Sequence, residues 1–228
     1  MIAAIHQPQY LPWIGYFDKI DRADVFIVLD NVQYKKNEWQ NRNRIRTSQG
    51  WQWITVPVLY KYPDKINIVK VNNTVDWRRK HVNALVSNYS RAGYFKTYFD
   101  FFEETFSHDW EYLADINIRV IQYLNNALGI NKEIILASKL SASEEPNERL
   151  IDICRHVQAD TYLSGKDGAK YMNLEKFAQA NIKVLFQDFH HPVYSQLYPT
   201  FEPFMSVIDI LFNHGPQSLK IIRECNKR

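Results

Sequence analysis

The sequence predicts an α/β protein with a mostly parallel, Rossmann-like sheet, a β-hairpin and a central helical insertion. Residues 2–5 (IAAI) and 25–29 (VFIVL) are continuous apolar runs of strand length, which is typical of strands buried on both faces. Residues 13–20 lie between them and have the length for a crossover helix, which parallel neighbours need. The last third of the chain again alternates short apolar runs with helical segments, which favours the same sheet.

The remaining elements follow in order from turn residues and periodicity. Residues 41–58 contain two extended segments around Ser48-Gln49-Gly50, which predicts a hairpin. Residues 76–129 have a helical pattern that breaks near Gly93 and at Ser107-His108, so we expect about three helices there. Later strands are expected at residues 133–137, 161–163 and 183–186, and later helices at 146–157 and 174–180.

Composition limits the functional classes. A chain of 228 residues is long enough for one buried core, so we expect a single domain over residues 1–228 with the insertion at about 76–129. Cys154 and Cys225 show neither CxxC nor Cys/His spacing, which indicates a reducing compartment and no metal site. The sequence has no apolar run of membrane-spanning length and no signal peptide, so we expect a cytoplasmic protein. Its net charge of +3 permits an anionic small-molecule partner and does not require nucleic acid.

Polar or titratable side chains follow four of the predicted strands. Because ligands of open α/β sheets bind beyond the carboxyl ends of strands, we expect these side chains to share one crevice. For any single strand, the alternative is that polar residues occur in the following loop, as in most loops, without a role in binding. The four groups are His6-Gln7, Asp30-Asn31, Ser164-Gly165-Lys166, and Gln187-Asp188 with His190-His191.

His6 and His191 are the candidate catalytic residues. An imidazole with its ordinary pKa of about 6.5 exchanges protons near neutrality, so His6 could act as a general acid or base. The alternative is a hydrogen-bonded histidine that packs the loop against the helix. His191 precedes Pro192, which favours an extended backbone and makes the side chain hard to bury by accident.

Arg42, Arg44 and Arg46 occupy alternate positions, so on a strand they project from one face. Guanidinium groups on one face could hold a phosphate or diphosphate. The alternative is an ordinary solvated face. Trp51 and Trp53 alternate in the same way on the partner strand, which fits either stacking on a sugar or base, or plain sheet packing.

Several long motifs resemble those of the WbqC-like family. They are HQPQYLPWIGYFDKI, ADVFIVLDNVQYKKNEWQNRNRI, WQWITVPV, ADTYLSGKDGAKY and HHPVYSQ, and the resemblance covers nearly the whole chain. It implies a role in O-antigen or other surface-polysaccharide synthesis, because members are encoded among such genes. Together with the strand ends and the arginine stripe, the motifs give these candidate substrate-binding residues: Gln7, Tyr16, Asp30, Lys36, Arg42, Arg44, Ser164, Gly165 and Gln196.

A more distant likeness connects the first strand and helix with HIGH-type nucleotidyltransferases. In this sequence Trp13-Ile14-Gly15-Tyr16 stands at the motif, so the glycine matches and both histidines are replaced. Those histidines stabilise charge on the transferring phosphate, so their loss argues against adenylyl transfer.

Three functional readings remain open from the sequence. The leading one is a transferase that moves an acyl or aminoacyl group to a nucleotide-linked or lipid-linked amino sugar, with a donor such as a carrier-protein thioester. The second is a nucleotidyl or other phosphate-group transferase that uses Lys36 and the arginine stripe. The third is a non-catalytic module that binds a sugar nucleotide. We expect no cofactor, no metal, no nucleic acid and no membrane span.

Overall fold

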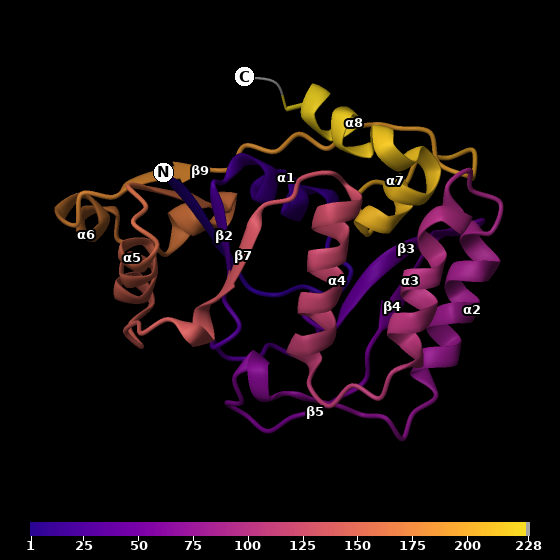
Figure 1. The fold of residues 1–228 in the computed structure, drawn as a ribbon, viewed down its shortest axis with the longest axis horizontal. Helices are drawn as coiled ribbons and strands as arrows, with labels where there is room; N and C mark the ends of the chain where they lie inside the picture. Colours follow the sequence, from indigo (N-terminus) through magenta and orange to yellow (C-terminus); the bar gives the residue numbers. More distant parts are fainter. Residues whose placement is uncertain (227–228) are drawn as a thin grey trace.

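The computed structural model describes residues 1–226. Its central sheet has five parallel strands in the order β7-β2-β1-β8-β9 (Figure 1). The predicted α/β class with a parallel sheet is therefore confirmed. The strands are β1 (Ile2–His6), β2 (Val25–Val28), β7 (Glu133–Leu136), β8 (Thr161–Ser164) and β9 (Lys183–Phe186).

Helices cover both faces of this sheet because successive strand residues point to opposite sides. Ala4 and Phe26 belong to one apolar cluster with residues of α1 and α4, whereas Ala3 and Ile27 belong to a second cluster with α5 and α6. The central strands β1 and β2 are thus buried on both faces, which is why they read as continuous apolar runs. The helices are α1 (Ile14–Arg22), α4 (Leu113–Ala127), α5 (Pro146–His156) and α6 (Leu174–Gln179).

The chain between β2 and β7 forms the predicted hairpin and then the predicted helices. The hairpin strands β3 (Arg42–Thr47) and β4 (Gly50–Thr55) pair antiparallel. Leu85 and Phe102 of the helical segment share one apolar cluster with the sheet residue Phe26, so these helices complete the core of the sheet. A short pair of strands was not predicted: β5 (Val58–Leu59) with β6 (Lys70–Val71). The other helices here are η1 (Ile66–Ile68), α2 (Trp77–Tyr89) and α3 (Phe95–Ser107).

Two helices near the C-terminus, α7 (Val207–His214) and α8 (Ser218–Glu224), were also absent from the sequence prediction. They lie along the same side of the molecule as α1 in Figure 1, and Arg223 pairs with Asp21 of α1 at 2.6 Å. Single 3₁₀ turns complete the fold: η2 (Ala137–Lys139), η3 (Lys166–Lys170) and η4 (Gly215–Gln217). No helix within residues 1–226 has the length and hydropathy needed to cross a bilayer.

The strand order reverses between β1 and β8. From β1 the chain proceeds through α1 to β2 on one side, and from β8 it proceeds through α6 to β9 on the other. The loops that leave the carboxyl ends of β1 and β8 therefore diverge, and this divergence is where open α/β sheets form their ligand crevice. The sheet thus fixes the location of the candidate site.

Candidate functional site

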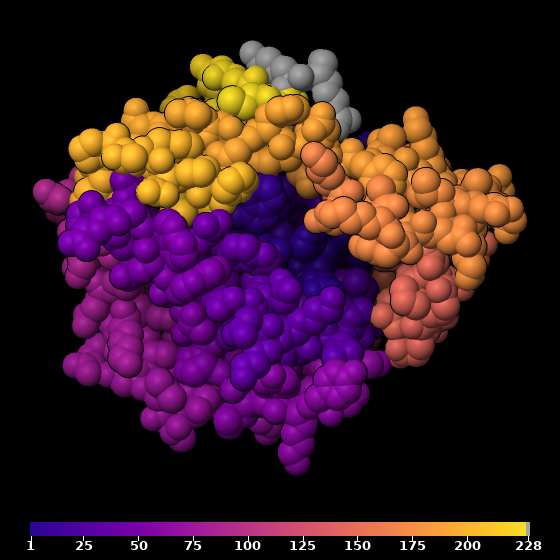
Figure 2. All heavy atoms as spheres, turned by 180° about the vertical axis from the view of Figure 1, so that it is seen from behind, coloured from indigo at the N-terminus to yellow at the C-terminus, as the bar shows by residue number. Residues whose placement is uncertain are grey.

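A cavity of about 810 Å³ opens at the carboxyl ends of β1 and β8. Its walls come from the end of β1, the first turns of α1, residues 33–35, α5 and η3. In the space-filling view, the N-terminal residues form the indigo floor of a hollow between the purple hairpin segment and the orange segment that contains β8 and β9 (Figure 2). The cavity gathers part of the predicted site: His6, Gln7, Tyr16 and Gly165 all line it.

Lys19 lines the cavity and was not among the predicted site residues, although it belongs to the first motif that resembles the family. Its side chain is only 2% exposed, and its Nζ donates to the carbonyl oxygen of Ile5 at 3.3 Å. Within residues 1–226, no carboxylate lies within salt-bridge distance of this amine. Burial without a counter-charge lowers the pKa of Lys19 to about 7. A lysine that is half neutral near pH 7 can accept a proton in a reaction, which an ordinary surface lysine does not do.

His6 lies beside Lys19 and is held as a neutral imidazole. Its Nδ1 is 3.0 Å from the carbonyl oxygen of Gln7, so Nδ1 carries the proton and Nε2 keeps a free lone pair. Burial, reinforced by the positive charge of Lys19, lowers the pKa of His6 to about 3. His6 is therefore a hydrogen-bond acceptor at physiological pH and a weak proton acceptor.

Tyr16 and Gln7 supply the neutral polar groups of the cavity. The Tyr16 ring stands edge-on to His6 with ring centroids 4.9 Å apart, and its buried hydroxyl has no hydrogen-bond partner within residues 1–226. Such an orphaned hydroxyl is costly unless a ligand or water satisfies it. The Gln7 Oε1 accepts from Gln40 Nε2 at 2.6 Å, which leaves the amide N–H groups of Gln7 for a ligand.

Gly15 is required by the packing of Trp13 across the start of α1. A Cβ at Gly15 would lie 2.3 Å from the indole Cη2 of Trp13, well inside any allowed contact. Both residues line the cavity, and Gln187 fixes this turn by donating to the Gly15 carbonyl oxygen at 2.8 Å. The group that closely approaches Gly15 is therefore the neighbouring indole.

The charge of the cavity is positive. Lys35, Arg149 and Lys166 line it together with Lys19, against the single carboxylate of Asp167 among its described lining residues. Low-dielectric walls strengthen the attraction for an anion at such a site. The cavity therefore favours a substrate that carries phosphate or carboxylate groups.

The structure places His191 outside the cavity lining. Its Nδ1 is 2.8 Å from the carbonyl oxygen of Pro192, and its Nε2 accepts from the backbone N–H of Phe204 at 3.0 Å. Both ring nitrogens are thus occupied, and burial lowers the pKa of this histidine. In this geometry His191 holds together two C-terminal segments.

The other predicted residues also lie away from the cavity lining. Asp30 accepts from the backbone N–H of Ser138 at 2.9 Å, and the buried Ser164 hydroxyl donates to Met172 Sδ at 3.5 Å. Gln196 Nε2 donates to Asp209 Oδ2 at 2.8 Å. Lys36 is exposed, while Arg42 and Arg44 lie on the outer face of the hairpin.

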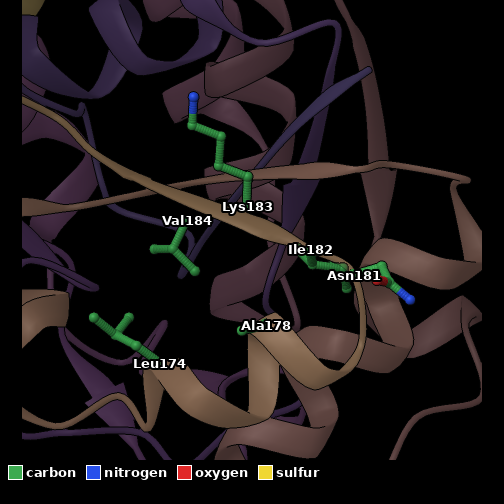
Figure 3. A pocket seen from close by; sticks show the side chains of 6 residues that line it. All are labelled: Leu174, Ala178, Asn181, Ile182, Lys183 and Val184. Carbon is green, nitrogen blue, oxygen red and sulfur yellow. The ribbon is translucent and has the colours of Figure 1, made fainter.

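A second, shallower hollow of about 370 Å³ lies between α6 and β9 at the outer edge of the sheet. Leu174, Ala178 and Val184 make it apolar, and the side chain of Lys183 extends away from Leu174 and Ala178 (Figure 3). The acid–base groups described above are all absent from its lining. Across residues 1–226, His, Cys, Asp and Glu side chains nowhere gather in the threes that a metal ion needs.

Comparison with known proteins agrees with the motif resemblance. The WbqC-like protein family matches residues 7–221. The chain belongs to this family. It is also 36% identical over 228 residues to the "Uncharacterized protein Rv1507c" of Mycobacterium tuberculosis, with 98% of each chain covered. No solved structure matches the chain. The family match begins at Gln7 and includes the α1 residues of the cavity, so the site described above lies within the part shared with the WbqC-like family.

Burial of Lys19 in this WbqC-like protein predicts a pH-dependent stability. The unfolded chain keeps this amine protonated up to a pKa of about 10.4, whereas the folded chain releases the proton at about 7. Between these values the unfolded state binds more protons, so folding stability rises with pH. We expect Lys19→Met to be more stable than the wild type at pH 6, with a difference that shrinks toward pH 10. Urea denaturation at both pH values measures the difference in free energy of unfolding between the variant and the wild type. A difference that does not change with pH would contradict the lowered pKa of Lys19.

Proposed function

We propose that this protein is a transferase that moves an acyl or aminoacyl group from a thioester to the amine of a nucleotide-linked or lipid-linked sugar. The observation that carries the proposal is the buried amine of Lys19, which has no carboxylate partner within residues 1–226 and lines the same cavity as His6 and the orphaned hydroxyl of Tyr16. These groups meet where the strand order reverses, in a positively charged cavity. The family resemblance supports a cytoplasmic role in surface-polysaccharide synthesis.

Lys19 is the general base in this proposal. The sugar amine attacks the thioester carbonyl carbon, a C–N bond forms, and the amine proton passes to Lys19 Nζ. The tetrahedral intermediate then collapses, the C–S bond breaks, and the thiolate leaves and takes up a proton. A base with a pKa near 7 is matched to this task at neutral pH, whereas the pKa of His6 is too low.

His6 and Tyr16 have complementary roles in the same step. His6 Nε2 accepts a hydrogen bond from the sugar amine. This bond orients the lone pair of the amine nitrogen toward the thioester carbonyl. The Tyr16 hydroxyl donates to the carbonyl oxygen, which becomes an oxyanion in the intermediate. Lys35, Lys166 and Arg149 attract the phosphates of the sugar carrier. His191 is a positioning residue in this scheme, because its ring nitrogens bond within the protein.

The test combines purified protein with a panel of nucleotide-linked amino sugars and short-chain acyl thioesters. We expect thiol release, followed with a thiol-reactive dye, to require both the protein and the amino sugar. The matched nucleotide sugar with a hydroxyl in place of the amine should give no release. ATP consumption without a thioester would favour phosphate-group transfer instead. Sugar-nucleotide binding without turnover of either donor would favour a binding module.

A further inference from the structure

The outward face of the hairpin carries a cluster of arginine and tryptophan side chains. Arg44 of β3 lies directly opposite Trp53 of β4, and Trp51 lies two residues before Trp53 on the same face. The Arg42 guanidinium sits 4.3 Å from the Trp53 ring centroid, and that of Arg44 sits 5.0 Å from the Trp51 ring centroid. Trp39 adds a third indole, 5.5 Å from Trp53 between ring centroids. We call these five residues the Trp–Arg surface.

The charges of the Trp–Arg surface are not neutralised within the described part of the protein. Across residues 1–226, no carboxylate lies within 4.0 Å of either the Arg42 or the Arg44 guanidinium. Within residues 1–226, the buried Nε–H groups of both arginines have no hydrogen-bond partner, and an Nη2–H group of Arg42 donates to the carbonyl oxygen of Asn37. Burial lowers the pKa of Arg44 in spite of the nearby carboxylate of Glu202. Two partly desolvated cations without a carboxylate partner, whose guanidinium donors are mostly unused, can bind an anion.

The aromatic part of the surface is open to solvent. Trp51 and Trp53 are 41% and 40% exposed, although tryptophan is among the most costly side chains to leave in water. Exposed indoles beside arginine are typical of surfaces that bind a partner. The C–H face of a pyranose ring packs on an indole, and a carboxylate or phosphate on the same sugar pairs with a guanidinium.

We propose that the Trp–Arg surface binds an acidic saccharide, with sugar rings on Trp51 and Trp53 and the anionic group held by Arg42 and Arg44. Both kinds of contact are available on one hairpin face. Trp51 and Trp53 remain exposed beside the guanidiniums that contact them, and neither guanidinium pairs with a carboxylate of residues 1–226. This binding does not depend on the reaction proposed for the cavity.

Charge and ring geometry favour a saccharide over single-stranded nucleic acid. A nucleic-acid strand gains its affinity from many phosphate contacts and from successive bases stacked on aromatic rings. The Trp–Arg surface offers only the two arginine cations, with Glu202 nearby. Its rings meet at 83° (Trp51 with Trp53) and at 47° (Trp39 with Trp53), so they form no parallel steps for consecutive bases.

The Trp–Arg surface borders the cavity. Trp39 is followed by Gln40, whose Nε2 donates to Gln7 in the cavity wall at 2.6 Å. The purple hairpin segment and the indigo floor of the hollow are adjacent in Figure 2. A saccharide on this surface is therefore placed to extend toward the cavity.

NMR titration of the ¹⁵N-labelled tryptophan indoles tests the proposal with trigalacturonate as the probe and neutral maltotriose as its control. We expect saturable shifts of indole N–H signals with trigalacturonate and none of comparable size with maltotriose. Arg42→Gln and Arg44→Gln should each weaken binding about ten- to a hundredfold, because each removes a charge-assisted contact. Arg79→Gln on α2 should bind trigalacturonate as the wild type does.

Three results would overturn the assignment. They are equal shifts with both sugars, unchanged affinity in both arginine variants, or tighter binding of oligothymidylate than of trigalacturonate. Melting temperatures of the arginine variants are measured on the same samples. If either variant is unfolded, Trp51→Leu replaces it, because an indole at 41% exposure contributes little to the core, and its affinity decides the question.

Discussion

Replacing Lys19 with methionine should lower the turnover of thioester and amino sugar by about 10²–10⁴-fold, the usual contribution of a positioned general base. Methionine keeps the apolar stem of the side chain, one atom shorter than lysine, and removes the only group at this position that accepts a proton. The same variant is expected to gain stability at pH 6, as described above. A variant that is both more stable and less active is the signature of a strained functional group.

Two further measurements test whether Lys19 acts as the general base or has no part in proton transfer. Lys19→Arg should also lose turnover, since a guanidinium stays protonated at neutral pH. In the wild type, kcat/KM should rise with pH through about 7, because only the neutral amine accepts a proton and the pKa of Lys19 is about 7. The exposed cavity residue Lys166 is the matched control, and Lys166→Met should raise KM with little change in kcat. Normal kcat in Lys19→Met would remove the base from the mechanism.

Arg46→Met should lower the free energy of unfolding by about 3–5 kcal/mol, because several buried acceptors lose their donor at once. The Arg46 side chain is 2% exposed. It donates to the carbonyl oxygens of Gly50, Thr47 and Thr200 and to Gln196 Oε1, and the Gly50 contact is 2.6 Å long. For a chain of this size the melting temperature should fall by about 10 °C.

Arg44→Met is the matched control for Arg46→Met, two residues away on the same strand and the same face. Its guanidinium contacts indole rings and makes no hydrogen bond to the described protein, so we expect a change of less than about 1 kcal/mol. Thermal unfolding of both variants checks the contrast. Equal losses would show that the hairpin face behaves as one uniform surface.

The fold was predictable where local pattern and burial agree. The buried strands β1 and β2 read as apolar runs, and Gly93 and Ser107 mark the ends of helices as expected. The pair β5–β6 was missed because each strand has two residues and is defined by its partner alone. The helix α7 was missed because residues 207–212 form an unbroken buried run, which shows no helical period. The helix α8 was missed because it has only 7 residues.

The site was predictable only in part, because its chemistry arises from tertiary burial. His6 and Gly165 were found from the rule that ligands bind beyond strand ends, and that rule uses sequence position alone. Lys19 on α1 reads as an ordinary helical lysine, and its low pKa appears only when β1 and β8 enclose the amine. The three arginines alternate along β3 as expected, yet the segment that contains Gln196 and Thr200 covers Arg46, which alternation cannot reveal.

The position of β1 in the middle of the sheet has a consequence for how the nascent chain matures on the ribosome. Strand β2 is made soon after β1, but Ile2 must wait for Thr161 to be synthesised before its other edge is paired. At typical elongation rates this leaves an open strand edge for roughly ten seconds or more. Open edges invite pairing with other chains, so chaperone protection should matter most in that interval. The cavity needs Gly165 and Gln187 for its walls, so it is among the last features to form.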